Sequence, residues 1–191
     1  MNGFLRLFAD LLVESGVPSD YLYFAKGPRE LPGFFRPVKE WDLVVVSPSS
    51  LIVAVEVKSQ IGSLGNNFNN RAEEAIGDAV DLWTAFRENA FGSVSPWVGY
   101  LMLLEDSPKS RRPVKIKEPH FPAFPEFKGA SYAKRYELLC RRLVLERHYT
   151  ATALLLSPKA DGTSGTYDEP ASDLTIQRFA SSMVTHAMGS L

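Results

Sequence analysis

The chain has few of the residues that build disulfides and structural zinc sites. It contains one cysteine, Cys140, and three histidines among 191 residues. A single thiol excludes a disulfide within the chain, and scattered histidines argue against a structural zinc site. Because Cys140 stands alone in a helical pattern, we expect a protein of a reducing compartment, the cytoplasm.

The sequence also lacks long hydrophobic runs. No apolar stretch approaches the roughly 20 residues that a membrane-spanning helix requires. The first residues, 1–15, carry neither a basic region nor a small-residue cleavage site. We therefore expect no membrane partner and no signal peptide.

A strong net charge is missing as well, since the formal net charge is −1. Overall charge thus gives no sign of a nucleic-acid partner, although two segments are locally basic. Their residues are Lys109, Arg111, Arg112, Lys115 and Lys117, followed by Lys128, Lys134, Arg135, Arg141, Arg142 and Arg147. Such patches contact phosphates in some proteins and form an ordinary solvated surface in others, so both interpretations stay open.

What the sequence does contain is enough apolar material for a folded core. Hydrophobic residues make up 45% of the chain, and there are three tryptophans. We expect one domain over residues 1–191. Residues 21–25 suggest a short strand and 27–37 a loop. The remaining elements are expected to be an N-terminal helix 3–15, a hairpin 41–58, a crossover helix 70–90, a buried strand 97–104, a helix 129–149, a strand 150–156 and a helix 172–188.

This order predicts a three-layer α/β fold. A hairpin followed by a helix and a buried strand forms a βαβ unit, so the sheet is expected to be mixed, with helices on its faces. The hairpin itself consists of two apolar runs joined by Ser47-Pro48-Ser49-Ser50, which is turn chemistry.

Three polar residues interrupt the apolar hairpin. Asp42 opens the first run, and Glu56 and Lys58 end the second, two positions apart. Side chains at i and i+2 project from one face of a strand, so Glu56 and Lys58 point the same way. Asp42 joins them only if the register places it opposite Glu56, which requires an odd loop or a β-bulge.

Two acids and a lysine on one face can hold Mg²⁺ and activate water against a phosphodiester. In this interpretation Asp42, Glu56 and the backbone carbonyl of Val57 bind the metal, and Lys58 orients or helps to deprotonate the attacking water. The alternative is an ordinary set of ion pairs at strand ends. Burying two acids in so apolar a sheet is costly, which favours the functional interpretation.

An asparagine-rich segment follows the hairpin, Asn66-Asn67-Phe68-Asn69-Asn70-Arg71. Asparagine and arginine are common base-reading side chains, so this segment is a candidate DNA contact. The structural alternative is a turn with Asn69 or Asn70 as the cap of the next helix. The candidate DNA-binding residues are Asn66, Asn67, Asn69, Asn70, Arg71, Lys128 and Arg135.

Together these residues carry a resemblance to a known family. Asp42 with Glu56-Val57-Lys58 resembles the PD-(D/E)XK nuclease motif, with Trp41 in place of the motif's proline. Longer segments resemble the XhoI-type type II restriction endonucleases over roughly residues 1–145. These segments are Trp41-Asp42-Leu43, residues 65–77, Pro119-His120-Phe121-Pro122, residues 127–132, Arg135-Tyr136-Glu137 and Leu139-Cys140-Arg141.

The resemblance implies a restriction-endonuclease-like core and a homodimeric, Mg²⁺-dependent enzyme. It further implies cleavage of double-stranded DNA at the palindrome CTCGAG, leaving 5′-phosphates and 5′ overhangs, in a restriction system with a cognate DNA methyltransferase. Two other functions stay open. One is a truncated DNA-binding relative that does not cleave, and the other is a repair or resolvase-type nuclease of the same superfamily.

Overall fold

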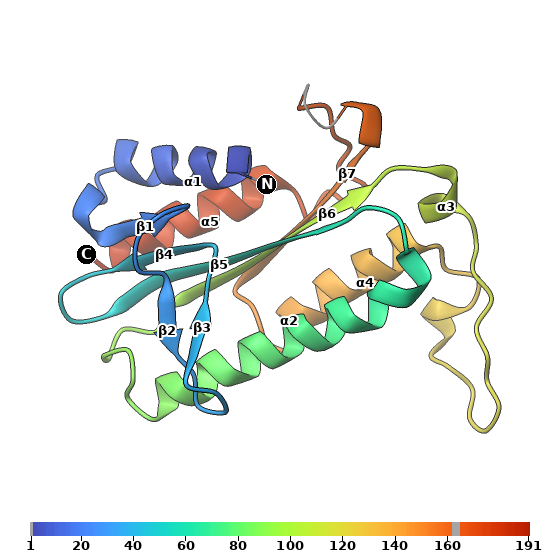
Figure 1. The fold of residues 1–191 in the computed structure, drawn as a ribbon, viewed down its shortest axis with the longest axis horizontal. Coiled ribbons are helices and arrows are strands. Elements are labelled where there is room, and N and C mark those ends of the chain that lie inside the picture. The colour runs from blue at the N-terminus through green and yellow to red at the C-terminus, as the bar shows by residue number, and fades with distance from the viewer. Residues whose placement is uncertain (1, 162–164) are drawn as a thin grey trace.

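The computed structural model describes residues 2–161 and 165–191, and a five-stranded mixed sheet lies at its centre (Figure 1). The strand order is β1-β4-β5-β6-β7. The strands are β1 (Leu22–Phe24), β4 (Leu43–Val46), β5 (Leu51–Gln60), β6 (Trp97–Glu105) and β7 (Ala151–Ser157). Strands β1, β4 and β5 pair antiparallel, whereas β5, β6 and β7 pair parallel. The mixed sheet and its hairpin confirm the predicted fold class.

Helices cover both faces of this sheet. Helices α1 (Asn2–Glu14) and α5 (Ile176–Gly189) pack on one face, and α2 (Leu64–Arg87) and α4 (Tyr132–Leu145) on the other (Figure 1). Short α3 (Pro108–Arg111) and three 3-10 turns, Ser19–Tyr21, Pro125–Phe127 and Lys159–Asp161, lie in the connections. A small antiparallel ribbon, β2 (Glu30–Pro32) with β3 (Val38–Glu40), completes the fold.

The side chains of β5 point alternately into two hydrophobic cores, one on each face of the sheet. Val53, Val55 and Val57 belong to the core under α1 and α5. Ala54 belongs to the core under α2 and α4. Because side chains alternate between the faces of a strand, Glu56 and Lys58 project toward α2. The polar residues of the hairpin are therefore presented to a helix that follows them directly in the chain.

Helix α2 differs from the expected helix 70–90, since it begins at Leu64 and ends at Arg87. The expected turn with a cap at Asn69 or Asn70 is wrong, and the asparagines lie in the first turns of the helix. Leu64 is buried, and Phe68 packs edge-on against Tyr136 of α4 with 5.1 Å between ring centroids. This tertiary packing outweighs the low helix propensity of asparagine.

The two C-terminal helices are shorter than expected. Helix α4 covers Tyr132–Leu145 instead of 129–149, because Ser131 caps its start and Arg147 adopts a left-handed backbone (φ 58°) after its end. Helix α5 begins at Ile176 and not near residue 172. The hydroxyl of Thr175 accepts a hydrogen bond from the Arg178 N–H at 3.3 Å and caps the start of the helix.

The segment 27–37, expected to be a loop, contains β2 and the turn into β3. Each of these strands has three residues, too few for a hydrophobic pattern to reveal. Within the described parts of the chain, no helix is long and apolar enough to span a bilayer.

Candidate active site

The β4–β5 hairpin brings Asp42 near Glu56. Leu43 lies opposite Val55 in the last pair of this ladder, so Asp42 directly precedes the paired residues. The loop 47–50 has an even number of residues, but a register shift between Val45 and Val46 compensates for it. The register shift is an irregularity of the expected kind, and Asp42 lies near enough to Glu56 for its charge to raise the pKa of Glu56.

Asp42 lies just where β4 stops pairing with β5. The Val57 N–H donates to Oδ2 of Asp42 at 2.7 Å, and the Asp42 N–H donates to the Val55 carbonyl at 3.1 Å. In a strand, the N–H and C=O of one residue point to the same side. The Val57 carbonyl therefore faces the same edge as the Asp42 carboxylate, which agrees with its expected place beside the two acids.

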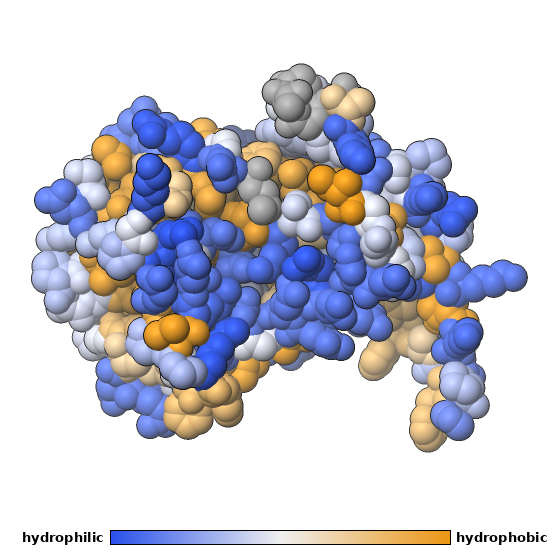
Figure 2. All heavy atoms as spheres, in the orientation of Figure 1, coloured by the Kyte–Doolittle hydropathy of each residue, from blue (hydrophilic) through white to orange (hydrophobic). Residues whose placement is uncertain are grey.

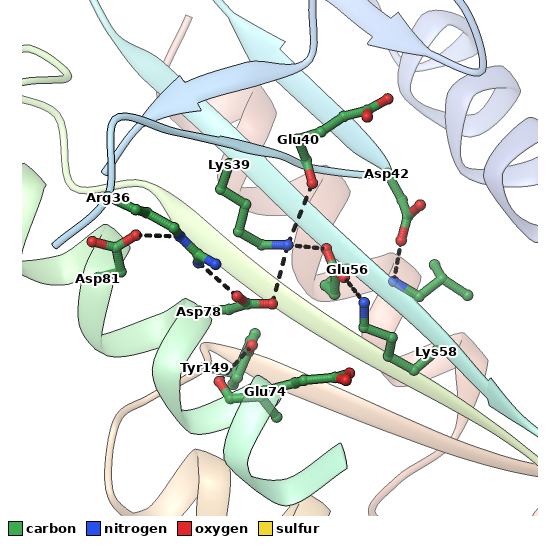
Figure 3. Close-up of polar contacts among 12 residues, drawn as sticks. Arg36, Lys39, Glu40, Asp42, Glu56, Lys58, Glu74, Asp78, Asp81 and Tyr149 are labelled. Carbon is green, nitrogen blue, oxygen red and sulfur yellow. Dashed lines mark hydrogen bonds and ion pairs between the residues drawn. The ribbon is translucent and has the colours of Figure 1, made fainter. Parts of the chain in front are cut away.

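Glu56 is the most deeply buried of the three predicted catalytic side chains. Its side chain is 4% exposed, and it pairs with two lysines (Figure 3). Oε2 accepts from Nζ of Lys39 at 3.0 Å, and Oε1 is paired with Nζ of Lys58. A buried carboxylate held between two ammonium groups can stay charged in an apolar sheet.

Burial and nearby charges shift the pKa values of Glu56 and Lys58. Burial raises the pKa of Glu56, and the charge of Asp42 adds to the rise, while Lys39 and Lys58 oppose it. For Lys58, burial acts to lower the pKa, but the charge and hydrogen bond of Glu56 outweigh burial and raise it. Lys58 is therefore held as an ammonium ion beside Glu56.

The oxygen atoms of this edge suit a small divalent cation. Among the residues that the structure describes, no cluster of three or more His, Cys, Asp or Glu side chains is arranged as a metal site. Mg²⁺, however, usually uses one or two carboxylates and keeps several waters for its other positions. Asp42, Glu56 and the Val57 carbonyl supply such a set, and these hard oxygen donors fit Mg²⁺ better than a softer metal.

Four further residues extend the site and were not identified from the sequence. Lys39 of β3 bridges Glu56 to Asp78 of α2, with 3.0 Å from Nζ to Oδ2 of Asp78. Arg36 pairs with Asp78 at 2.6 Å and with Asp81 at 2.7 Å. The result is a chain of alternating charges, Arg36–Asp78–Lys39–Glu56–Lys58, that joins three elements.

Asp81 anchors the β2–β3 ribbon to α2. Its Oδ1 accepts the Phe34 N–H at 2.7 Å and the Phe35 N–H at 2.8 Å. Burial acts to raise the pKa of Asp81, but these hydrogen bonds and Arg36 lower it overall. Asp78 and Asp81 lie among the buried residues of α2, which include Ala75, Ala79 and Leu82. Two acids on an apolar helix face are the feature of the sequence that indicates this pair.

The structure gives several of the candidate DNA-binding residues partners within the protein. Arg71 pairs with Glu74, and Lys128 lies 3.6 Å from Glu118. Arg135 donates to the Val114 carbonyl at 3.3 Å and lies over the ring of Tyr132. Their contact with DNA stays a prediction.

The asparagine segment lies beside the first basic segment. A cavity of about 360 Å³ at the start of α2 is lined by Asn66, Lys109 and Arg112, among others. Asn66, Asn69 and Asn70 are exposed, whereas Asn67 is half-buried. Hydrophilic side chains also gather across the middle of the face shown in Figure 2, over β5 and α2.

Comparison with known proteins agrees with the geometry. The family model described as restriction endonuclease XhoI matches residues 1–169. The type II restriction enzyme BstVI of Geobacillus stearothermophilus is 53% identical over 193 aligned positions, covering 97% of this chain and 86% of that protein. The type II restriction enzyme XhoI of Xanthomonas vasicola is 48% identical over 161 positions, covering 83% of this chain and 65% of that protein.

A third relative, the type II restriction enzyme AbrI of Azospirillum brasilense, is 50% identical over 123 positions, covering 63% of this chain and 55% of that protein. No solved structure matches the chain significantly.

Proposed function

Because this chain belongs to the XhoI restriction endonuclease family, we propose that it is a type II restriction endonuclease that hydrolyses both strands of DNA with Asp42, Glu56 and Lys58. The observation that supports the proposal best is that the Asp42 and Glu56 carboxylates lie near each other at the edge of the β4–β5 ribbon, with the Lys58 ammonium paired to Glu56. The proposal treats residues 1–191 as a single nuclease domain.

The proposed cofactor is Mg²⁺, held by Asp42, Glu56 and the Val57 carbonyl. When bound, the metal polarises the scissile phosphate and lowers the pKa of a bound water. Asp42 is already turned toward the Val57 backbone. Lys58 is paired with Oε1 of Glu56, and its side chain is 25% exposed. In this proposal it turns from Oε1 toward substrate, where it orients the attacking water and offsets charge on the phosphorus.

The proposed substrate is the palindrome CTCGAG in duplex DNA, cut to leave 5′-phosphates and 5′ overhangs. This preference comes from the family resemblance. A palindrome is read most simply by a two-fold dimer, so we propose a homodimer. The exposed asparagines at the start of α2 and the nearby basic residues Lys109 and Arg112 are the proposed DNA contacts. The biological role is restriction of foreign DNA in the cytoplasm, with a cognate methyltransferase that protects the host sites.

A cleavage assay with two matched duplexes tests this function. We expect Mg²⁺ to support double-strand cutting of a duplex that contains CTCGAG, and EDTA to stop it. A duplex with the same composition and a scrambled centre should stay intact. Binding of CTCGAG without cutting in Mg²⁺ would favour the non-cleaving relative. Nicking of branched or mismatched DNA without sequence preference would favour a repair-type nuclease.

The three intact residues Asp42, Glu56 and Lys58 favour an enzyme over a binding protein. A protein that no longer cleaves has no need to keep two acids and a lysine together at the edge of an apolar sheet, where such groups are costly to hold.

A further inference from the structure

Lys39 is surrounded by oxygen atoms in the manner of a bound cation. Its Nζ lies 3.0 Å from Oε2 of Glu56, 3.0 Å from Oδ2 of Asp78 and 3.3 Å from the Glu40 carbonyl. An ammonium group has three N–H donors, so these three acceptors can satisfy it fully. Two carboxylate oxygens and a carbonyl oxygen are also a common ligand set for a divalent metal ion.

Lys39 and its two carboxylate partners are all largely buried. The side chains of Lys39, Glu56 and Asp78 are 11%, 4% and 9% exposed. Two buried carboxylates that face the same point repel each other and require a cation between them. Lys39 supplies that charge from within the chain, on the far side of Glu56 from Lys58 (Figure 3).

Several contacts fix the Lys39 ammonium in place. Lys39 lies in β3, opposite Leu31 of β2, and its Nζ lies 4.8 Å from the centre of the Trp41 ring. The β2–β3 ribbon is in turn tied to α2 through Asp81, which accepts the Phe34 and Phe35 N–H groups. Lys39 is therefore held more firmly than Lys58, whose side chain is 25% exposed.

We propose that the Lys39 ammonium occupies the place of a second divalent cation between Glu56 and Asp78, so that each subunit works with one catalytic metal ion. Oε2 of Glu56 is paired with Lys39, so the metal would be held by Asp42 and by Oε1 of Glu56, which Lys58 has to release first. Lys39 is a positioning residue in this proposal, because it acts through Glu56. The inference rests on the proposed function, since it assumes that Asp42 and Glu56 bind a divalent metal.

Counting bound Mn²⁺ tests the proposal without measuring cleavage. Free Mn²⁺ is measured by electron paramagnetic resonance during titration of the full chain in the absence of DNA. We expect the parent to bind one Mn²⁺ per chain and Lys39→Ala to bind two, because the substitution empties the place between Glu56 and Asp78. The variant Lys39→Arg keeps a cation there and should bind one, as should the double variant Lys39→Ala/Asp78→Asn.

One Mn²⁺ in both the parent and Lys39→Ala would overturn the proposal. If Lys39→Ala does not fold, the spectrum of Mn²⁺ bound to the parent protein still tests the proposal. Two Mn²⁺ ions that share Glu56 would broaden each other's resonance. Such broadening in the parent contradicts a single-metal site, and a spectrum of isolated ions supports it. The proposed function fails separately, if the parent binds one Mn²⁺ but does not cut a CTCGAG duplex.

Discussion

Replacing Glu56 with glutamine is expected to lower the rate of DNA cleavage by about a thousandfold or more while leaving DNA binding nearly unchanged. The amide keeps the shape of the side chain but loses the negative charge that lies near Asp42. Loss of a metal ligand removes several kcal/mol of transition-state stabilisation, and about 4 kcal/mol corresponds to a thousandfold change in rate. Single-turnover cleavage of a CTCGAG duplex in Mg²⁺ measures the effect.

Binding is measured separately with Ca²⁺ in place of Mg²⁺, so that the duplex is not consumed. A matched control is Glu14→Gln at the exposed end of α1, which removes the same charge on the opposite side of the sheet and should leave the rate unchanged. Thermal unfolding of each variant verifies that it is folded. A Glu56→Gln rate within tenfold of the parent would show that Glu56 is not a metal ligand.

Replacing Lys58 with methionine is expected to lower cleavage by about a hundredfold to ten-thousandfold, the range typical of a group that assists proton transfer or stabilises charge. Metal binding should be kept or strengthened, because the variant removes a cation that is paired with Oε1 of Glu56. Methionine preserves most of the apolar stem, so packing against the sheet is largely maintained. Single-turnover rates and Mn²⁺ titration distinguish this effect from loss of the metal.

The control for this prediction is Lys26→Met, an exposed lysine just after β1, for which we expect an unchanged rate. A Lys58→Met variant that cleaves within threefold of the parent would assign the lysine an ordinary ion-pair role. A variant that loses Mn²⁺ binding would instead show that Lys58 maintains the shape of the metal site.

The hairpin is the part of the fold that the sequence predicts best. Its two apolar runs, the turn residues 47–50 and the spacing of Asp42 from Glu56 are all local, and together they require the bulge that the structure contains. The crossover helix and buried strand β6 follow from hydrophobic periodicity in the same way. Local patterns thus establish which face of β5 carries Glu56 and Lys58.

The other half of the charge network depends on contacts between distant segments. The β2–β3 ribbon exists because Asp81 binds backbone N–H groups 46 and 47 residues earlier in the chain. Lys39 lies beside Glu56 and Asp78 because this ribbon packs against α2. No local pattern in the sequence indicates such a long-range arrangement. The sequence therefore predicts Lys58 as a partner of Glu56 but does not predict Lys39.

The conformation of the asparagine run at the start of α2 also depends on contacts between distant segments. A run of asparagines favours turns and caps by its intrinsic propensity. The packing of Leu64 and Phe68 onto the core nevertheless keeps the run helical. Asn66, Asn69 and Asn70 are consequently exposed on a helix, with Asn66 beside Lys109 and Arg112, a more defined arrangement than a loop would provide.

Anomalous diffraction from crystals grown with Mn²⁺ tests most directly whether Asp42 and Glu56 hold a common ion. We expect one strong peak per chain within coordination distance of both carboxylates and of the Val57 carbonyl, with the Lys39 ammonium still between Glu56 and Asp78. A peak elsewhere, or carboxylates that turn away from each other in the presence of Mn²⁺, would contradict the proposed active site.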